Sequence, residues 1–581
     1  MAKNKPVYAF EEADSKKRML LGGKGAGLSE MTRLKLPVPP GFTITTEVCN
    51  KYYDNNGKLP KDVMPAVMKN IAKMEKKTGK KWNSTKNPLL VSVRSGAAIS
   101  MPGMMDTILN LGLNEKTVEG FAEQTKNPRF SWDSYRRFIQ LFGKVVFGVN
   151  DEKFDHVLDD AKEKQGVTDD SKLSVESLKS IVSKYKKICE EHTKRKFPDT
   201  PDEQLVLSIE AVFKSWMGER AIVYREKNNI TKDIANGTAV NVVTMVFGNM
   251  GDDSATGVVF TRNGHNGKKE IEGEYLINAQ GEDVVAGVRT GKSIELLKKD
   301  MPKSHKELSN ACAKLEKHFR EPQDIEFTIE QGKFYLLQTR TAKMSAAALV
   351  KTSVDMVKEK LINKDKALTR IPAQQLEALL HRTMDESKIK DFKKLAKGIA
   401  ASPGAASGIV VFDVKKAIEL GDSGKKVILV RKETKPEDVP AFFSSEGILT
   451  SLGGKSSHAA IVSRGMGKPC IVGCPELKID YDNNIGTANG MTIKEGETIT
   501  IDGSEGTVFI GEIPTVEPKV TKDFEQILAW AQKTKTLGIR ANADTPDMAK
   551  LARKFGGQGI GLCRTERMFN GSDRINLFVE M

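Results

Sequence analysis

Residues 453–470 read GGKSSHAAIVSRGMGKPC and combine two patterns with different meanings. The Gly-Gly-Lys-Ser part is similar to the end of a nucleotide-binding phosphate loop, whose full pattern is G-x-x-x-x-G-K-[ST]. That pattern requires a glycine at position 449, where this chain has Leu449. The spacing therefore argues against a phosphate loop, and His458 becomes the residue to explain.

The residues around His458 predict a strand, a turn and a helix. EGILTS (446–451) is typical of a strand, the two glycines permit a tight turn, and Ser456 and Ser457 are preferred helix N-cap residues. A helix over residues 458–466 follows in this interpretation, with KPCIVG as the next strand. His458 then lies in the first turn of a helix, where free backbone N–H groups and the helix dipole favour an anion.

A histidine at such a position has two interpretations. A neutral imidazole can accept a phosphoryl group near pH 7, because its unperturbed pKa is about 6.5. The hydroxyls of Ser456 and Ser457 would then donate to the phosphoryl oxygens. The alternative is a structural histidine at a helix cap, which is the commoner role of a lone histidine. The GG-x-S-S-H pattern favours phosphorylation of His458, with Ser456 and Ser457 in the same catalytic site.

The same stretch closely resembles the phosphohistidine motif of the pyruvate, phosphate dikinase family. The similarity continues upstream through RKETKPEDVPAF and downstream through ITIDGSEGTVFIGEIP. The family usually has methionine and threonine where this chain has Lys455 and Ser456. Ser456 keeps the hydroxyl, whereas Lys455 adds a cation whose effect the sequence does not explain. The resemblance implies a swivelling β/α domain that carries phosphate on His458.

The composition is that of a large globular protein. The chain has 581 residues, of which 39% are hydrophobic and 29% charged, and this length suits several domains. Six cysteines form no zinc or disulfide framework, because the closest pair is an isolated CxxxC at Cys470 and Cys474. No apolar run has the length of a membrane helix, and the N-terminus lacks a signal sequence. We expect a cytoplasmic protein that does not bind membranes.

The formal net charge of +15 raises the question of nucleic-acid binding. Basic residues are mixed with acidic ones, as in KYKKICEEHTKRK, and no aromatic-rich basic groove accompanies them. We therefore expect a solvated lysine-rich surface and no nucleic-acid partner. A positive field also suits phosphorylated substrates.

Local patterns divide the chain into five segments of a multidomain fold with α/β and α+β parts. The first mixes helices with short β-rich runs, the second and fourth are connectors, the third alternates short strands with Gly and Pro turns, and the last reads as strand, helix, strand. These segments are residues 1–343, 344–397, 398–514, 515–535 and 536–581. In the first connector, four apolar residues at helical spacing predict one buried helix face: Val350, Val354, Val357 and Leu361.

Two stretches of the first segment contain residue types that bind phosphate. LLGGKGAGLSEM (20–31) places four glycines around Lys24, and a glycine-lined turn with a lysine holds phosphates through backbone N–H groups and a point charge. A purely structural glycine turn fits equally well. In VSVRSGAA (91–98) a strand leads Arg94 into a turn. Its guanidinium can bind phosphate through two N–H groups, or it forms an ordinary salt bridge.

A third stretch, QDIEFTIEQGKFYLLQTR (323–340), predicts two strands joined by a Gln-Gly turn. Asp324 and Glu326 are two residues apart and hence on one face of a strand. We expect Gln338, on the partner strand, to face them. Carboxylate and amide oxygens suit Mg²⁺ that bridges triphosphate oxygens, although ordinary surface charge on a hairpin gives the same pattern.

In order and spacing, these stretches resemble the ATP-grasp domain of the same family. The resemblance implies magnesium ligands at Glu326 and Gln338. It implies nucleotide or phosphate binding by a larger set: Lys24, Arg94, Glu282, Asp324, Glu326, Gln338 and Arg340. The family has NGK after LQTR, where this chain has Thr341, Ala342 and Lys343.

GIGLCRTERMF (559–569) resembles the second strand of the family's C-terminal (β/α)₈ barrel, which binds phosphoenolpyruvate and pyruvate. Arg564 follows the strand, at the end where such barrels have their sites, and matches a substrate-binding arginine. Arg567 replaces a histidine, and Cys563 does not match the catalytic cysteine. One βαβ unit cannot cover both faces of a parallel sheet, so we expect a barrel that is cut short.

The resemblance implies that ATP, phosphate and pyruvate are converted to AMP, pyrophosphate and phosphoenolpyruvate through a phosphohistidine. We expect Mg²⁺ as the cofactor, ATP as a substrate and, for this chain alone, only the ATP and phosphate half-reaction. A monovalent-cation requirement and a homo-oligomeric state stay open. Two alternatives remain: a phosphoenolpyruvate synthase, which releases AMP and phosphate, and a phosphocarrier or regulatory protein that relays phosphate to a separate partner.

Overall fold

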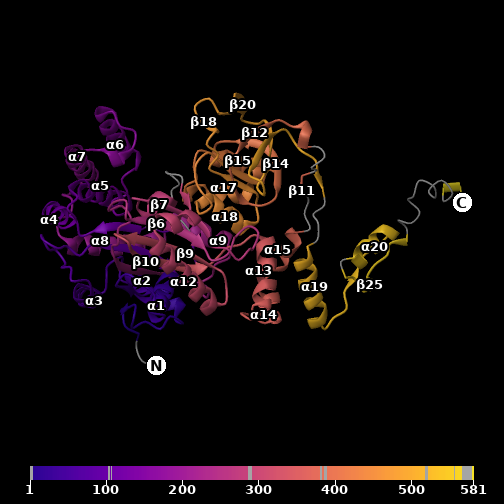
Figure 1. The fold of residues 1–581 in the computed structure, drawn as a ribbon, viewed down its shortest axis with the longest axis horizontal. Coiled ribbons are helices and arrows are strands. Elements are labelled where there is room, and N and C mark those ends of the chain that lie inside the picture. Colours follow the sequence, from indigo (N-terminus) through magenta and orange to yellow (C-terminus); the bar gives the residue numbers. More distant parts are fainter. Residues whose placement is uncertain are drawn as a thin grey trace. The chain divides into compact units, whose positions relative to one another are not determined.

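The computed structural model describes residues 4–101, 105, 107–285, 291–379, 383–384, 389–516, 521–554, 556–565 and 579–580. The chain divides into two units. The first comprises Met1–Ala348 and Arg382–Glu517, and the second comprises Leu349–His381 and Pro518–Met581. Within the first unit, we call residues 4–348 the N-terminal lobe and residues 383–516 the histidine lobe (Figure 1). None of the helices in these described ranges combines the length and apolar character of a membrane span.

The N-terminal lobe contains two five-stranded antiparallel sheets. In spatial order, the first sheet consists of β1 (Val7–Ala9), β2 (Gly41–Ile44), β5 (Thr238–Thr244), β3 (Val91–Ala97) and β4 (Thr107–Leu111). The second consists of β10 (Lys333–Thr341), β9 (Gln323–Glu330), β6 (Ala255–Phe260), β7 (Glu272–Ile277) and β8 (Lys292–Ser293). Every β-rich run that the sequence predicts in this lobe is a strand of one of these sheets.

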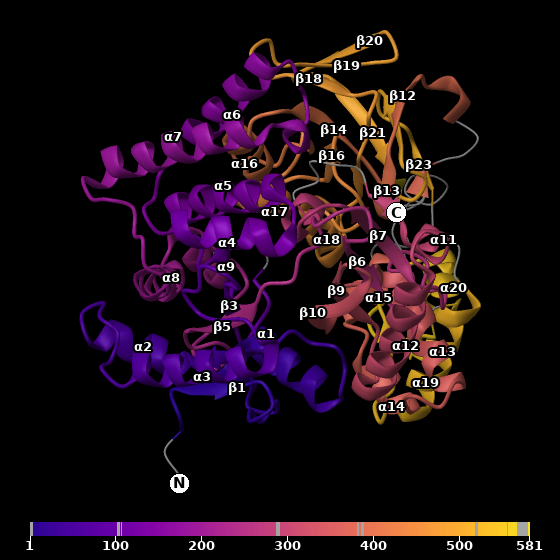
Figure 2. The ribbon, with the colours of Figure 1, turned by 60° about the vertical axis from the view of Figure 1, so that its left-hand side comes forward.

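Helices surround the two sheets, and several begin and end at the expected capping residues. They are α1 (Arg18–Arg33), α2 (Thr46–Asp54), α3 (Val63–Thr78), α4 (Glu115–Thr125), α5 (Pro128–Val145), α6 (Glu152–Gln165), α7 (Val175–Thr193), α8 (Pro201–Ser215), α9 (Glu219–Lys227), α10 (Gly281–Val285), α11 (Leu297–Asp300) and α12 (Pro302–Phe319). Asn114 caps α4 by accepting the backbone N–H of Thr117 at 2.8 Å, and α3 ends at Gly79, in the left-handed conformation. Figure 2 shows α4–α7 together on one side of this lobe.

The glycine-rich stretch around Lys24 is a kinked helix, whereas the sequence predicts a turn. Gly22 has φ 68° and interrupts α1, and the helix resumes directly afterwards. A Cβ on Gly22 would lie 1.8 Å from the carbonyl oxygen of Gly96 on β3, and one on Gly25 would lie 2.7 Å from Oγ1 of Thr43. The glycines thus allow α1 to pack directly on the sheet, which places Lys24 in the first turn after the kink.

The histidine lobe is built on one mixed eight-stranded sheet. Its strands, in spatial order, are β12 (Lys394–Lys397), β22 (Thr507–Ile510), β21 (Thr498–Asp502), β14 (Ala405–Val411), β15 (Val427–Arg431), β16 (Gly447–Thr450), β17 (Cys470–Val472) and β13 (Ile399–Ser402). The central run β14–β15–β16–β17 is parallel, and its connections contain α16 (Val414–Asp422), α17 (Val439–Ser444) and α18 (His458–Met466). A small antiparallel sheet of β18 (Lys478–Asp480), β19 (Ile485–Ala488) and β20 (Met491–Lys494) is added.

The chain runs into and out of the histidine lobe through one short ribbon. β11 (Thr383–Met384) pairs antiparallel with β23 (Thr515–Val516). Thr383 lies opposite Val516, and Met384 lies opposite Thr515. The two ends of the lobe are therefore neighbours.

The second unit contains the C-terminal segment and parts of the two predicted connectors, 349–381 and 518–535. Residues 394–397, predicted as the end of the first connector, form β12 of the histidine lobe instead. The elements of the second unit are α13 (Ala346–Lys358), which begins in the first unit, α14 (Lys364–Thr369), α15 (Ala373–Ala378), α19 (Lys522–Thr534), β24 (Arg540–Ala541), α20 (Pro546–Lys554) and β25 (Gly559–Ile560). Val350 and Val354 are fully buried against α19, and Val357 and Leu361 are partly buried there, so the predicted apolar face is confirmed. β24 and β25 are parallel, as the strand–helix–strand pattern predicts.

Candidate active site

A cavity of about 1270 Å³ lies within the first unit and is lined by residues of both lobes. Seven of the sequence-predicted site residues line it: Lys24, Arg94, Glu326, Gln338, Arg340, Ser456 and His458. They come from α1, β3, the β9–β10 hairpin, the turn before α18 and the first residue of α18. Segments more than four hundred residues apart in the chain thus meet around one space.

Lys24 and Arg94 form the part of the wall that belongs to the first sheet. The close packing of α1 on β3 brings Lys24 beside Gly96, whose Cβ position is 3.3 Å from the Lys24 Cβ. Burial lowers the pKa of Lys24 to about 8, the positive charges of Arg94 and Arg340 act in the same direction, and Glu326 opposes them. A bound anion would relieve this crowding of positive charge.

The hairpin of β9 and β10 has the predicted turn and register. Gln331 and Gly332 both have positive φ, as a two-residue hairpin turn requires. Glu326 lies directly opposite Gln338, and a bulge between Leu336 and Gln338 sets this pairing. Two oxygen-bearing side chains therefore stand side by side on the cavity wall, and the predicted facing of Glu326 and Gln338 is confirmed.

Asp324 lies behind this wall and is paired with Arg340. The Nε of Arg340 donates to Oδ2 of Asp324 at 2.7 Å, and only 3% of Asp324 is exposed. Burial raises the pKa of Asp324 while the Arg340 charge opposes the rise. Burial also works against the charge of Arg340, but Asp324 and Glu326 outweigh it and raise the Arg340 pKa. Asp324 thus holds a charged guanidinium at the cavity surface.

His458 is the first residue of α18, as predicted. β16 ends at Thr450, and a turn containing Gly453, at φ 107°, leads into the helix. The site therefore lies beyond the carboxyl end of a parallel strand, the usual place for a site in such sheets. Ser457 is the N-cap residue, as predicted, and its hydroxyl makes no capping hydrogen bond.

Three buried polar atoms around the helix start lack a hydrogen-bond partner among the residues that the structure describes. They are Nε2 of His458 and the Oγ atoms of Ser456 and Ser457. Burial lowers the pKa of His458 to about 4; Arg340 and Lys343 add to this effect, and Glu437 opposes it. The imidazole is therefore neutral at pH 7 and has a free lone pair or N–H in the site.

Three family models match this chain along nearly its whole length. The "pyruvate phosphate dikinase, AMP/ATP-binding domain" model matches residues 18–58, 55–307 and 293–361. The "PEP-utilising enzyme, mobile domain" model matches residues 424–506, and the "PEP-utilising enzyme, PEP-binding domain" model matches residues 518–581.

The chain belongs to the pyruvate, phosphate dikinase family. Similar curated relatives are the pyruvate, phosphate dikinases of Entamoeba histolytica (53% identical over 578 residues), Clostridium symbiosum (50% over 570) and Rhizobium meliloti (48% over 591). The matches cover 98–99% of this chain and 65% of each relative. The chain thus spans about two thirds of the length of these pyruvate, phosphate dikinases and combines an AMP/ATP-binding domain with PEP-utilising domains.

Several predicted residues lie outside the cavity or outside the described part of the chain. Ser457 is buried beside the cavity without lining it. Glu282 belongs to α10, but its side chain lies outside the described residues, as does Arg567. In the second unit, Arg564 follows β25, and Asp544 accepts its backbone N–H at 2.7 Å. Membership in the pyruvate, phosphate dikinase family implies roles for these residues, and those roles remain predictions.

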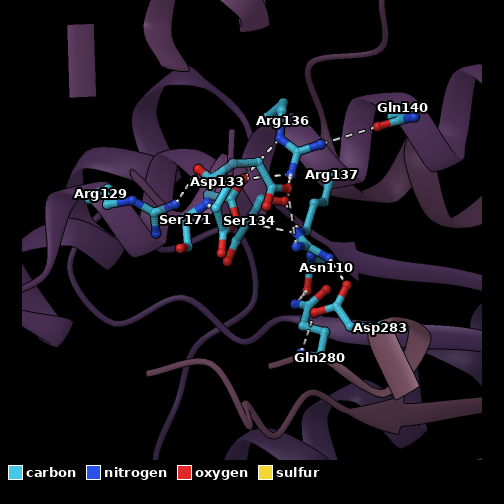
Figure 3. A network of polar contacts seen from close by, with 12 residues as sticks. Asn110, Arg129, Asp133, Ser134, Arg136, Arg137, Gln140, Ser171, Gln280 and Asp283 are labelled. Atoms are coloured by element: carbon cyan, nitrogen blue, oxygen red, sulfur yellow. Dashed lines mark hydrogen bonds and ion pairs between the residues drawn. The ribbon is translucent and has the colours of Figure 1, made fainter. Parts of the chain in front are cut away.

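A buried ion-pair network that the sequence did not predict positions α10. Arg137 reaches from α5 to Asp283 of α10 at 2.8 Å and to Asp133 at 3.2 Å, and Arg136 donates to Asp133 at 2.6 Å (Figure 3). Gln280, next to α10, lines the cavity. The only signal in the sequence was the spacing of Asp133, Arg136 and Arg137 on one helix face, which is also common on solvated helices.

Proposed function

We propose that this chain transfers a phosphoryl group from ATP to His458 and carries it for the second half of a pyruvate, phosphate dikinase reaction. The observation that carries the proposal is the unpartnered, buried Nε2 of His458, among the described residues, at the cavity that Lys24, Arg94 and Arg340 also line. Three cations would hold the triphosphate, and a neutral imidazole would attack it.

The proposed phosphorylation of His458 by ATP balances in bonds and in products. The bond from the β-phosphorus to the oxygen that bridges it to the α-phosphorus breaks, and the β-phosphorus bonds to Nε2 of His458. The bond from the γ-phosphorus to the oxygen that bridges it to the β-phosphorus also breaks, and an oxygen of inorganic phosphate takes up the terminal phosphoryl group. AMP and pyrophosphate leave. The lone pair of the neutral imidazole forms the new bond, and its availability at pH 7 follows from the low pKa of His458. The hydroxyls of Ser456 and Ser457 would donate to the phosphoryl oxygens.

Glu326 and Gln338 fit a magnesium ion in this proposal. They stand opposite each other in register and offer two oxygen ligands at the cavity, a small number that suits an ion also held by phosphates and water. Magnesium would supply charge neutralisation on the triphosphate oxygens. Arg340, fixed by Asp324 at 2.7 Å, would present its remaining N–H groups to the same phosphates.

The remaining assignments extend this reading to the whole chain. The N-terminal lobe would be an ATP-grasp domain and the histidine lobe a swivelling domain. Residues 536–581 would be the first βαβ unit of a (β/α)₈ barrel, with Arg564 binding phosphoenolpyruvate or pyruvate at the carboxyl end of β25. Residue types at matching family positions support these assignments, and the cavity lined by both lobes supports the first two.

The dependence of AMP release on phosphate tests this function. With β-labelled ATP and Mg²⁺, we expect labelled protein, AMP and pyrophosphate when inorganic phosphate is present, because phosphate must accept the terminal phosphoryl group. Thin-layer chromatography of the products measures this. In a parallel reaction with γ-labelled ATP, AMP release with labelled inorganic phosphate as the co-product, at the same rate without added phosphate, would instead indicate a phosphoenolpyruvate synthase.

The low pKa of Lys24 predicts a pH dependence of ATP binding. Burial sets the Lys24 pKa near 8 in the free protein, and bound phosphates would raise it. Above pH 8 binding must therefore take up a proton, so affinity falls as pH rises. We expect the Kd for ATP, measured by isothermal titration calorimetry, to rise about tenfold from about pH 7 to about pH 9.

The matched control is Lys24→Arg, whose guanidinium stays charged over this range. Its Kd is expected to change less than about twofold between the same pH values, as expected for a permanently charged group. A wild-type Kd that stays constant from pH 7 to pH 9 would show that Lys24 does not contact the phosphates.

A further inference from the structure

Lys455, which the sequence left unexplained, connects the two lobes. Its ammonium pairs with Oε1 of Glu272, and its backbone N–H donates to Oε1 of Glu274 at 3.2 Å. Both glutamates lie on β7 of the N-terminal lobe. The carbonyl oxygen of Lys455 accepts a hydrogen bond from Nη2 of Arg464 at 3.3 Å. One residue in the turn before His458 thus binds β7 and α18 together.

A hydrogen bond within the N-terminal lobe holds the carboxylate of Glu272, the partner of Lys455, in position. Oε2 of Glu272 accepts the backbone N–H of Gly264 at 2.9 Å. The Glu272 side chain is 11% exposed and that of Lys455 31% exposed. Because the pair is partly shielded from water, solvent and salt screen it less than a fully exposed ion pair, and it is still within reach of dissolved salt.

The backbone of the turn also lies close to β7. A Cβ on Gly454 would lie 2.0 Å from Oε2 of Glu274. On α18, the buried guanidinium of Arg464 lies over the Phe260 ring at 5.2 Å from its centroid. Figures 1 and 2 show α18 beside β6 and β7. The ion pair of Lys455 with Glu272 is therefore one edge of a tight contact that surrounds His458.

A second ion pair between the lobes is weaker. Nη1 of Arg220 lies 3.0 Å from Oε1 of Glu437, with the two side chains 39% and 52% exposed. Exposed pairs of this kind contribute little to association. The contrast identifies Lys455 as the cation with the greater influence on how the lobes meet.

We propose that Lys455 is a positioning residue whose ion pair with Glu272 latches the histidine lobe onto the N-terminal lobe and keeps His458 at the cavity. Its removal leaves Glu272 partly buried and unpaired, which favours separation of the lobes. The consequence for turnover rests on the proposed function: the latch promotes phosphorylation of His458 and must open before the phosphohistidine meets its acceptor.

The latch is tested by the accessibility of His458 in the full chain without any nucleotide. Diethyl pyrocarbonate modifies neutral imidazoles, and peptide mass spectrometry at about pH 7.5 measures the rate at His458. In the docked lobes Nε2 is covered, and separation of the lobes is expected to expose it and speed its modification. We expect Lys455→Met to increase the rate about tenfold in about 50 mM NaCl. Raising NaCl to about 500 mM should speed modification of the wild type and leave the variant unchanged.

Three further variants make the test specific. Lys416→Met removes a lysine paired with Glu495 inside the histidine lobe, and we expect the wild-type rate. Lys455→Glu should be modified at least as fast as Lys455→Met, and adding Glu272→Lys should slow it again by restoring opposite charges. Equal rates and salt responses in the wild type and Lys455→Met would overturn the latch. Because no ATP is used, absence of phosphohistidine would overturn the proposed function and leave this result intact.

Discussion

A His458→Ala variant is expected to carry no acid-labile phosphate after incubation with β-labelled ATP, Mg²⁺ and inorganic phosphate. The imidazole is the proposed covalent acceptor, and its Nε2 is the atom left unpartnered in the described part of the site. Removal of a covalent acceptor abolishes the step and does not merely slow it. We expect the phosphate-dependent release of AMP to fall by at least about a thousandfold for the same reason.

Two controls separate loss of the acceptor from loss of the fold. His156→Ala changes an exposed histidine on α6, and it should be labelled like the wild type. His458→Ala itself should still be stabilised by ATP in a thermal-shift assay, because Lys24, Arg94 and Arg340 are unchanged. Labelling of His458→Ala at the wild-type level would place the phosphoryl group on another residue and refute the proposed function.

A Gly22→Ala variant is expected to lose about 3–5 kcal/mol of unfolding free energy, the range of severe core substitutions. Alanine would occupy a left-handed conformation, at a cost of about 1 kcal/mol. Its Cβ would also lie 1.8 Å from the Gly96 carbonyl oxygen, and backbone of a central strand cannot move aside without breaking pairs between β3 and β5. Urea denaturation followed by circular dichroism measures the loss.

The matched control for Gly22 is Gly79→Ala. Gly79 also has a positive φ, of 71°, but no atom lies within 4 Å of its added Cβ. This variant should lose only the conformational part, about 1 kcal/mol. Equal losses for the two variants would show that contact with Gly96 is unimportant. The Gly22 variant should also bind ATP more weakly, because Lys24 is two residues away on the same helix.

Local patterns predicted the elements that carry the candidate site. The strand, turn and helix around His458 were predicted because turn glycines, hydroxyl caps and an apolar helix face all occur within about twenty residues. The two-residue turn of the hairpin was predicted from the sequence, but its register alone would put Leu337 opposite Glu326, and the bulge between Leu336 and Gln338 brings Gln338 there. Each of these features depends on neighbours in the sequence.

The nature of the glycine stretch could not be predicted in the same way. A glycine that adopts a turn and a glycine that lets a helix approach a strand look alike in sequence. The space beside Gly22 is filled by Gly96, seventy-four residues later. The buried pair of Arg137 and Asp283 is hidden for the same reason, since its members are 146 residues apart.

Lys455 shows the limit most clearly. Residues 453–470 contain no acidic side chain that could pair with its ammonium, and its partner Glu272 lies 183 residues upstream in another lobe. From the sequence alone, only the positive charge of Lys455 can be inferred. The fold brings the turn before His458 next to β7, and this contact forms the ion pair of Lys455 with Glu272.

The ribbon of β11 and β23 has a consequence for how the histidine lobe is joined to the rest of the chain. Opposite residues of an antiparallel pair lie about 5 Å apart, so the first and last residues of the lobe, Thr383 and Val516, are almost in contact. The lobe is thus topologically an insertion, which can be excised or transplanted as one piece of chain.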